Sequence, residues 1–447
     1  MSPLSSAPTA PAPSSSAALL NELNTYVLAE PHPFVVDLAR SEGMYLATLE
    51  GDRLFDWAGY YGAKLIAHNH PGLYEAEYTR RLVVAANNKI ANPDFLTPEC
   101  LEYYRTLHQL GPQCMQNPGL EVYAVNSGAE AVENMMKYLI NLHHQRLLSE
   151  GKTPRARRFV YFDQAFHGRT VFALNVTRVS HDPVMTKDFQ GLIPGNLQVP
   201  FPALDTTESE AETREKVARC LTILENLFEH YRDEIVAVIL EPIQGAGGHR
   251  VAPRSFFQQL SELCHTHQIP LAFDEVQTAG GATGTFFTID GFDLPHPPQA
   301  VASGKKLGNG VVYMLNRMDD LGVLDSTWGG TLADMVRFVQ EYAIVRREGL
   351  IEKVPTLGAL LVETLQGLAE RFPELMYNVR GYGLYQGFSM RTPGLKQTLI
   401  QRARDREKLL LLGAGADTIR LRPHLHVSEE DIHTLGAMLE RLLTELS

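Results

Sequence analysis

Apolar runs alternate with helical patterns through the middle of this chain. Between residues 121 and 310, short runs rich in Val, Ile, Leu and Phe are followed by segments whose apolar residues recur at helical spacing. Such short runs, bounded by Gly, Pro or acidic residues, predict buried strands. Repetition of strand, helix and strand predicts a mainly parallel sheet with helices on both faces. We therefore expect an α/β fold with a large, doubly wound sheet domain. Alternating residues on either side of Glu50–Asp52 predict a β-hairpin near the N-terminus. A long helical region is expected from about Asp334 to Phe372, with breaks near Gly349 and Pro355.

The apolar run Pro270–Phe273 leads directly into an acidic residue, Asp274. That carboxylate would lie at the carboxyl end of a strand, where open α/β sheets bind their ligands. About thirty residues later, Lys305 and Lys306 follow the small residues Ser303–Gly304. An aspartate for a pyridinium nitrogen and a lysine for an aldehyde together indicate a pyridoxal phosphate site.

Other predicted strands also end in residues suited to ligand binding. Ser127–Gly128 separates a strand over residues 121–125 from a helix expected from Ala129 to about Ser149. Free N–H groups at a helix start favour an anion site, although Ser-Gly also fits an ordinary helix cap. Phe166, His167 and Arg169 follow a strand over residues 158–162. Taken singly, such a histidine is more often structural and such a phenylalanine is more often part of the core.

The composition limits the partners and the location. A net charge of −12 and a pI of about 5.7 argue against nucleic acid or an anionic membrane as a partner. The four cysteines are scattered, which suits a reducing compartment and gives no metal-site spacing. No apolar run approaches the ~18 residues of a membrane span. Residues 1–16 lack the features of a secretory signal, so we expect a disordered tail there and a cytoplasmic protein that binds no metal.

Taken together, the motifs resemble those of the class III, or ω, aminotransferases, which are pyridoxal phosphate enzymes of fold type I. Within that class the resemblance is strongest to the L-lysine 6-aminotransferases, and it runs from about Tyr26 to the C-terminus. It implies a large domain over residues 65–330 and a smaller α+β domain from the N- and C-terminal segments, 17–64 and 331–447. The stretches that carry it are Asn126–Asn134, Ala165–Arg169, Phe273–Thr278, Ser326–Gly330 and Gly413–Arg420.

The resemblance implies roles for the residues around the cofactor. Asp274 would keep the pyridine nitrogen protonated, and Lys306 would bond to the cofactor aldehyde and then move the substrate proton. Lys305 is the competitor, but class members place the reactive lysine four residues before the glycine that matches Gly310, which selects Lys306. Glu241 matches a family glutamate behind the site, and a purely structural role fits it equally well.

The same motifs imply further contacts and a partner subunit. Thr327 resembles the residue that reaches the cofactor phosphate from the other chain of a dimer, which implies a homodimer with shared active sites. Phosphate, ring and phenolic-oxygen contacts are implied for Ser127, Gly128, Ala129, Phe166, His167 and Gln277.

Carboxylate recognition would fall to Arg169 and Arg420, because a planar guanidinium binds a carboxylate through two hydrogen bonds. Tyr61 is expected either in a packed surface turn or in the pocket wall. In lysine and ornithine enzymes of this class a switch glutamate masks the arginine that matches Arg420, and this sequence has Ala246 at that position. The departure leaves a buried arginine without its counter-ion. Arg422, two residues after Arg420, is expected at the surface or behind the site.

The expected activity is transfer of the 6-amino group of L-lysine to 2-oxoglutarate in a ping-pong reaction. The alanine at position 246 favours an alternative, an ω-amine or 4-aminobutyrate transaminase that uses pyruvate or 2-oxoglutarate. A protein that binds the cofactor without turnover is disfavoured by the lysine–aspartate pair, and a decarboxylase or racemase is disfavoured by the two arginines.

Overall fold

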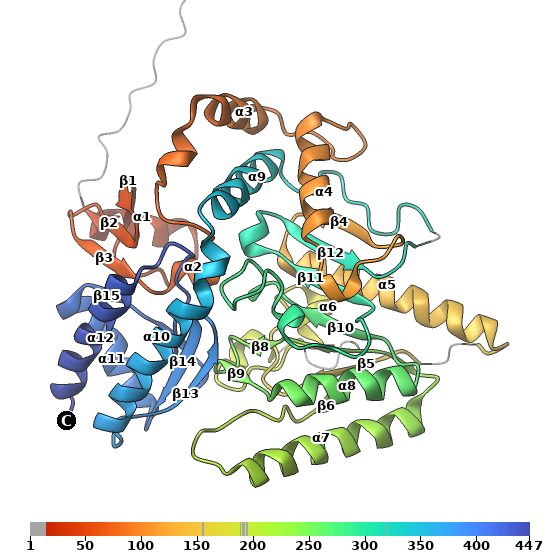
Figure 1. Ribbon diagram of the computed structural model, residues 1–447. Helices are drawn as coiled ribbons and strands as arrows, with labels where there is room; N and C mark the ends of the chain where they lie inside the picture. Colours follow the sequence, from red (N-terminus) through yellow and green to blue (C-terminus); the bar gives the residue numbers. More distant parts are fainter. Residues whose placement is uncertain (1–14, 154–155, 188, 190–192, 194, 319) are drawn as a thin grey trace, which may run out of the picture.

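The computed structural model describes residues 15–153, 156–187, 189, 193, 195–318 and 320–447 (Figure 1). A seven-stranded sheet forms its centre, in the order β4-β12-β11-β10-β7-β5-β6. All neighbours are parallel except at β12, which is antiparallel to β4 and β11. The sheet is mainly parallel, as predicted. Its strands are β4 (Glu121–Val125), β5 (Arg158–Phe162), β6 (Leu197–Val199), β7 (Ile235–Leu240), β10 (Leu271–Asp274), β11 (Ala300–Ser303) and β12 (Gly310–Met314).

Each face of this sheet has its own hydrophobic cluster. Leu271 and Phe273 pack into one cluster and Ala272 into the other, because alternate side chains of a strand point to opposite faces. The long helices predicted around the sheet are present. The helices are α1 (Ser16–Tyr26), α2 (Gly59–Gly62), α3 (Ala76–Asn87), α4 (Pro98–Leu110), α5 (Gly128–Ser149), α6 (Val171–Leu174), α7 (Glu210–Tyr231), α8 (Arg254–Thr266), α9 (Leu332–Arg347), α10 (Leu350–Arg371), α11 (Pro393–Glu407) and α12 (Glu429–Thr444). The 3-10 helices are η1 (Pro71–Tyr74), η2 (Gln113–Met115), η3 (Pro183–Met185), η4 (Thr288–Gly291) and η5 (Lys305–Leu307).

The two ends of the chain meet in one smaller sheet. The predicted N-terminal hairpin is formed, and its second strand pairs in parallel with a strand from near the C-terminus. Figure 1 shows the red N-terminal strands beside the blue C-terminal helices. The smaller sheets contain β1 (Val36–Glu42), β2 (Tyr45–Thr48), β3 (Arg53–Asp56) and β15 (Leu409–Leu410); β13 (Met376–Tyr382), β14 (Tyr385–Met390), β17 (Thr418–Arg420) and β16 (Leu412–Ala414); and β8 (Ile243–Gln244) with β9 (Arg250–Val251).

Two local predictions need correction. The tail was expected over residues 1–16; residues 1–14 lie outside the described residues, but Ser15 caps α1 and Ser16 is buried in it. Ser16 belongs to the folded chain because its N–H and hydroxyl both bond to the Glu50 carboxylate. Helix breaks were expected near Gly349 and Pro355, and Glu348 and Gly349 do separate α9 from α10. Pro355 lies inside α10 and does not break that helix.

The predicted limits of the domains, at 65 and 331, stay a prediction. Within the described residues, no helix has the length and apolar character needed to cross a membrane.

Candidate active site

A cavity of about 520 Å³ opens where the carboxyl ends of the parallel strands meet. This is the edge at which the sequence placed the ligand. Ser127, Lys306 and Thr327 were also predicted for the site but are not among the residues that line it. The predicted residues that do line it are Tyr61, Gly128, Ala129, Phe166, His167, Arg169, Glu241, Asp274, Gln277 and Arg420.

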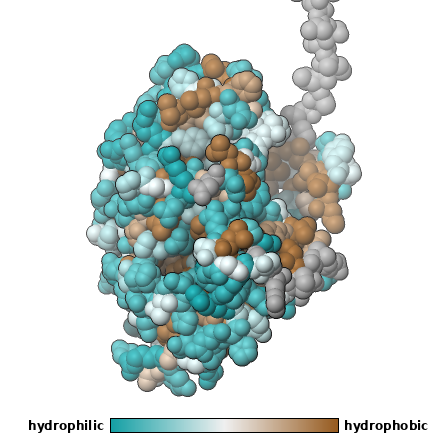
Figure 2. All heavy atoms as spheres, turned by 90° about the vertical axis from the view of Figure 1, so that its right-hand side faces the viewer, coloured by the Kyte–Doolittle hydropathy of each residue, from teal (hydrophilic) through white to brown (hydrophobic). Residues whose placement is uncertain are grey.

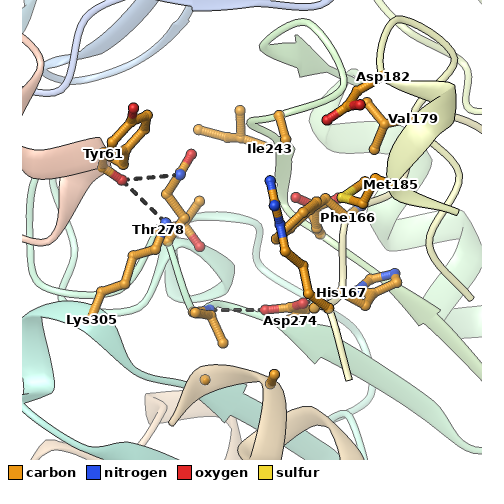
Figure 3. Close-up of a pocket in the computed structure, with 18 of the residues that line it drawn as sticks. Tyr61, Phe166, His167, Val179, Asp182, Met185, Ile243, Asp274, Thr278 and Lys305 are labelled. Atoms are coloured by element: carbon orange, nitrogen blue, oxygen red, sulfur yellow. Dashed lines mark hydrogen bonds and ion pairs between the residues drawn. The ribbon is translucent and has the colours of Figure 1, made fainter. Parts of the chain in front are cut away.

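Asp274 and His167 form a buried pair at the base of this cavity (Figure 3). Nδ1 of His167 lies 2.8 Å from Oδ2 of Asp274, and Oδ1 accepts the N–H of Val276 at 3.0 Å. Burial by itself lowers the pKa of His167, but the hydrogen bond and charge of Asp274 outweigh it and raise that pKa overall. The pair therefore fixes the carboxylate in one orientation, with the histidine as its support.

Glu241 lines the cavity and also holds a neighbouring backbone group. Its Oε1 accepts the backbone N–H of Phe166 at 2.9 Å, which positions the aromatic ring that lines the cavity. Burial raises the pKa of Glu241 to about 7, with the charge of Asp274 adding to the effect and His167 opposing it. A carboxyl group with that pKa can hold or release a proton near neutral pH, so both its structural bond and its charge bear on the site.

The two neighbouring lysines differ in where their amines lie. Lys305 lines the cavity, has a left-handed backbone with φ of 49°, and donates from Nζ to the carbonyl of Tyr61 at 3.1 Å. Lys306 is buried behind the lining, where its Nζ donates to the carbonyls of Gln277 and Ala279 at 2.8 and 2.9 Å. The choice of Lys306 from the sequence stays a prediction, and the geometry favours Lys305, the one of the two lysines that lines the cavity. That choice depended on the number of residues between the lysine and Gly310. A difference of one residue in this loop would select Lys305 in place of Lys306.

Burial also sets the charge of these amines. It lowers the pKa of Lys305 to about 8, helped by the positive charges of Arg420 and Arg422. Burial and the charges of Lys305 and Arg422 likewise lower the pKa of Lys306, well below its usual value. A lysine with a pKa of about 8 is partly a free amine near neutral pH, as a nucleophile and proton carrier must be.

The start of α5 contributes to the lining of the cavity. Gly128 and Ala129 line it, and the free N–H groups of a helix start point toward bound anions. Ser127 caps the helix by accepting from the N–H of Glu130 at 3.2 Å. Its hydroxyl therefore has the ordinary capping role in this structure, while a phosphate contact stays a prediction.

Two buried arginines share one neutral acceptor. Oε1 of Gln277 lies 3.5 Å from Nη1 of Arg420 and 3.2 Å from Nη2 of Arg422. Within the described chain, neither guanidinium has a carboxylate within 4.0 Å, and Nε of Arg420 has no hydrogen-bond partner. Ala246 lines the cavity nearby. Burial lowers the pKa of Arg420 to about 10, because a buried positive charge without an ion-pair partner is costly.

Arg422 is buried behind the lining of the cavity, which was one of the two positions expected for it, whereas a position at the surface is wrong. It is completely buried, and its Nη2 also lies 2.8 Å from Nδ1 of His249. Burial and the charge of Arg420 lower the pKa of Arg422 to about 9. The signal in the sequence was the alternation Arg420-Leu421-Arg422 next to a strand.

Tyr61 contributes to the pocket wall and also through its backbone. Its carbonyl accepts from Nζ of Lys305 and from Nε2 of Gln277, at 3.1 and 3.2 Å. Arg169 is exposed and lines the cavity. Thr327 is exposed outside it, so its predicted contact from a second chain is not tested by one chain.

A cluster of possible metal ligands lies away from the cavity, at His70, Glu348 and His426. Nδ1 of His70 accepts the N–H of Gly72, and Nδ1 of His426 accepts the N–H of Ala67. A neutral imidazole then carries its proton on Nε2, the atom that faces the Glu348 carboxylate at 3.2 or 3.0 Å. The three residues therefore form a hydrogen-bonded group in which Nε2 of each histidine donates to the carboxylate. A metal ion would need lone pairs on those nitrogen atoms.

The cavity residues fit pyridoxal phosphate. Its anionic group suits the start of α5, its ring nitrogen suits the Asp274–His167 pair, and its aldehyde suits the amine of Lys305. Fold and site together define a pyridoxal phosphate-dependent transferase of fold type I.

Comparison with known proteins narrows the class. The family Aminotransferase class-III matches residues 26–443. An L-lysine-epsilon aminotransferase of Mycobacterium tuberculosis is 31% identical over 440 residues, which are 94% of each chain. A 4-aminobutyrate aminotransferase of Emericella nidulans is 26% identical over 98% of this chain and 90% of its own. The solved lysine aminotransferase from M. tuberculosis has a TM-score of 0.90 and 30% identity, covering 97% of this chain and 100% of that one. The chain belongs to the class III aminotransferases and is a pyridoxal phosphate-dependent enzyme.

Proposed function

We propose that this enzyme moves the terminal amino group of a diamino acid, most of all the 6-amino group of L-lysine, to a 2-oxo acid, most of all 2-oxoglutarate. The observation that carries the proposal is one cavity that holds Lys305, Asp274, Arg169 and Arg420 together. It offers an amine for chemistry and two arginines for carboxylates. The relatives described as L-lysine-epsilon aminotransferases support the donor.

Lys305, in place of Lys306, is the lysine that we assign to the covalent bond with the cofactor. Once a substrate amine replaces it, its free amine is positioned to carry a proton between the substrate carbon and the cofactor, and its lowered pKa suits that task. Asp274, held by His167, keeps a proton on the ring nitrogen. The bound cofactor supplies an electron sink for the resulting carbanion.

The reaction has two half-reactions. In the first the amine donor leaves as an aldehyde and its amino group stays on the enzyme; in the second the 2-oxo acid takes up that group and leaves as an amino acid. Arg420 and Arg422, with only the neutral Gln277 as a shared acceptor, attract the carboxylate of the 2-oxo acid.

A second candidate is an ω-amine or 4-aminobutyrate transaminase. It is favoured by Ala246, which leaves the arginines without a counter-ion while the donor is bound. Such a site accepts a donor carboxylate as readily as an acceptor carboxylate.

We further propose that the enzyme is a homodimer with shared sites. Exposed apolar side chains support an interface: Val83, Val84, Phe95, Leu96 and Trp328. Figure 2 shows apolar patches amid a mainly polar face. Thr327 lies next to Trp328 and is exposed, as a residue that serves another chain must be. We also propose a reducing, cytoplasmic location, which the four free cysteines support. The proposed domain limits are 17–64, 65–330 and 331–447.

The test is single half-reactions of the purified holoenzyme, followed through the cofactor absorbance. L-lysine, L-ornithine, 4-aminobutyrate and a simple ω-amine are mixed separately with the enzyme, and 2-oxoglutarate or pyruvate is then added. Fast conversion by L-lysine that 2-oxoglutarate reverses supports the lysine proposal. Conversion mainly by simple amines, reversed by pyruvate, overturns it in favour of the second candidate.

A further inference from the structure

We propose that Asp182 determines donor specificity by binding a second ammonium group, so that the site selects diamino acids over ω-amino acids that lack that group. The proposal rests on the proposed function and extends it. Asp182 lines the same cavity as Lys305, Arg169 and Arg420. Figure 3 shows its carboxylate on the opposite side of the cavity from Lys305. A donor whose reacting amine lies at Lys305 therefore extends toward Asp182.

The carboxylate of Asp182 has no structural task in the described residues. Asp182 stands at the N-cap of η3, but its side chain makes no capping hydrogen bond. None of the described side chains forms a hydrogen bond or an ion pair with it. The other two acidic residues of the cavity are engaged, Asp274 with His167 and Glu241 with the N–H of Phe166. Asp182 is thus the acidic group of this lining that is free to bind a ligand.

The surroundings of Asp182 leave its charge available. His181 is the adjacent ionisable residue of the lining, and burial together with the positive charge of Lys396 lowers its pKa. It is therefore mainly neutral at pH 7 and above, and does not cancel the negative charge. Arg169 and Arg420 are the other cations of the cavity besides Lys305, and both are suited to carboxylates through two parallel hydrogen bonds.

The wall between the two ends suits a hydrocarbon chain. Val179, Met185 and Ile243 line the cavity. Figure 3 shows Val179 and Met185 on the side of Asp182, and Ile243 between Asp182 and Tyr61. A donor with several methylene groups would place them against this wall, its carboxylate at an arginine and its second ammonium at Asp182. An ammonium has three N–H donors and no acceptor, which is the complement of a free carboxylate.

The test compares three donors that differ in one group each. L-lysine has the second ammonium and the carboxylate, 6-aminohexanoate lacks the ammonium, and 1,5-diaminopentane lacks the carboxylate. Rates of the first half-reaction at increasing donor concentration give a maximal rate and an apparent Kd for each. The variants are Asp182→Asn, Asp182→Glu as the charge-conserving variant, and Asp293→Asn, an exposed carboxylate outside the lining, as the control.

We expect Asp182→Asn to lower the preference for L-lysine over 6-aminohexanoate about 10-fold, the size of one charge-assisted hydrogen bond. The loss should fall mainly on the apparent Kd, extend to 1,5-diaminopentane, and be partly restored in Asp182→Glu. The control should keep the wild-type preference. An unchanged preference, or an equal loss for all three donors, would overturn the role of Asp182. If the wild-type enzyme converts none of the donors, the proposed function itself fails, and this inference fails with it.

Discussion

Oε1 of Gln277 accepts hydrogen bonds from Nε and Nη2 of Arg422, at 3.3 and 3.2 Å. The same oxygen is 3.5 Å from Nη1 of Arg420. The close approach requires a glycine at position 245, because a Cβ there would lie 2.0 Å from this oxygen. A neutral amide thus stands beside both guanidiniums, so a substrate carboxylate need not displace a protein carboxylate to reach them.

Gln277→Glu should weaken the binding of acceptors. The new carboxylate would pair with Arg420 and Arg422 and compete with the 2-oxo acid. We expect the KM for 2-oxoglutarate to rise about 10-fold, with a smaller effect on a donor without a carboxylate, 1,5-diaminopentane. Steady-state and half-reaction kinetics measure both values, and Gln259→Glu, an exposed residue of α8, is the matched control. An unchanged KM for 2-oxoglutarate would contradict the account.

Asp274→Asn should slow the first half-reaction by about 10² to 10³-fold, the usual effect of removing one preorganised charge interaction in an active site. Asparagine has the same shape but cannot keep a proton on the ring nitrogen. The hydrogen bond that raises the pKa of His167 would be weakened too. Rapid-mixing absorbance gives the rate, and the unchanged cofactor content shows that the site still binds. A rate within about twofold of wild type would remove Asp274 from its assigned role.

Mixed dimers test the shared site. In the proposed dimer each site takes Lys305 from one chain and Thr327 from the other. A homodimer of Lys305→Ala or of Thr327→Val therefore has the change in both of its sites. If Thr327 serves the partner chain, a hybrid of the two variants has one site with both changes and one site with neither. We therefore expect activity to return when the two are unfolded, mixed and refolded together. A hybrid no more active than its parents would contradict the proposed exchange of residues.

Stability should fall in mild acid, partly because of His424. Burial lowers its pKa to about 3, with the nearby rings of His68 and His426 adding to the effect and the carbonyl of Gly43 and the charge of Asp56 opposing it. A histidine that resists protonation in the folded state stabilises that state above pH ~6.5, and the stability is lost as the pH falls toward the folded value. For this group alone the loss at pH 5 is about 2 kcal/mol.

The measurement is the free energy of unfolding between pH 7.5 and 5. His424→Gln should flatten the dependence, while His433→Gln, an exposed residue of α12, should not. His167 has a raised pKa, so its contribution to the pH dependence of the unfolding free energy has the opposite sign. That contribution is the same in every variant and cancels when the variants are compared. Parallel curves for wild type and His424→Gln would contradict the assignment.

The sequence could predict the parts of this molecule that depend on local pattern. Asp274 follows an apolar run. Because that run lies among alternating strands and helices, it is predicted to be a strand of the parallel sheet, with Asp274 at its carboxyl end. The choice between Lys305 and Lys306 depends on which way one loop turns, and adjacent residues point in different directions there. The burial of Arg422 depends on Gln277 and His249, which lie far away in the chain. Such contacts exist only once segments far apart in the sequence pack together.

The most direct test of the account is to find which lysine carries the cofactor. Borohydride reduction of the holoenzyme fixes the bond between lysine and cofactor, and peptide mass spectrometry then locates the added mass. We predict that it lies on Lys305, that Lys305→Ala abolishes the labelling, and that Lys306→Ala retains it. A label on Lys306 in the wild-type enzyme would contradict the assignment of the cavity's central amine.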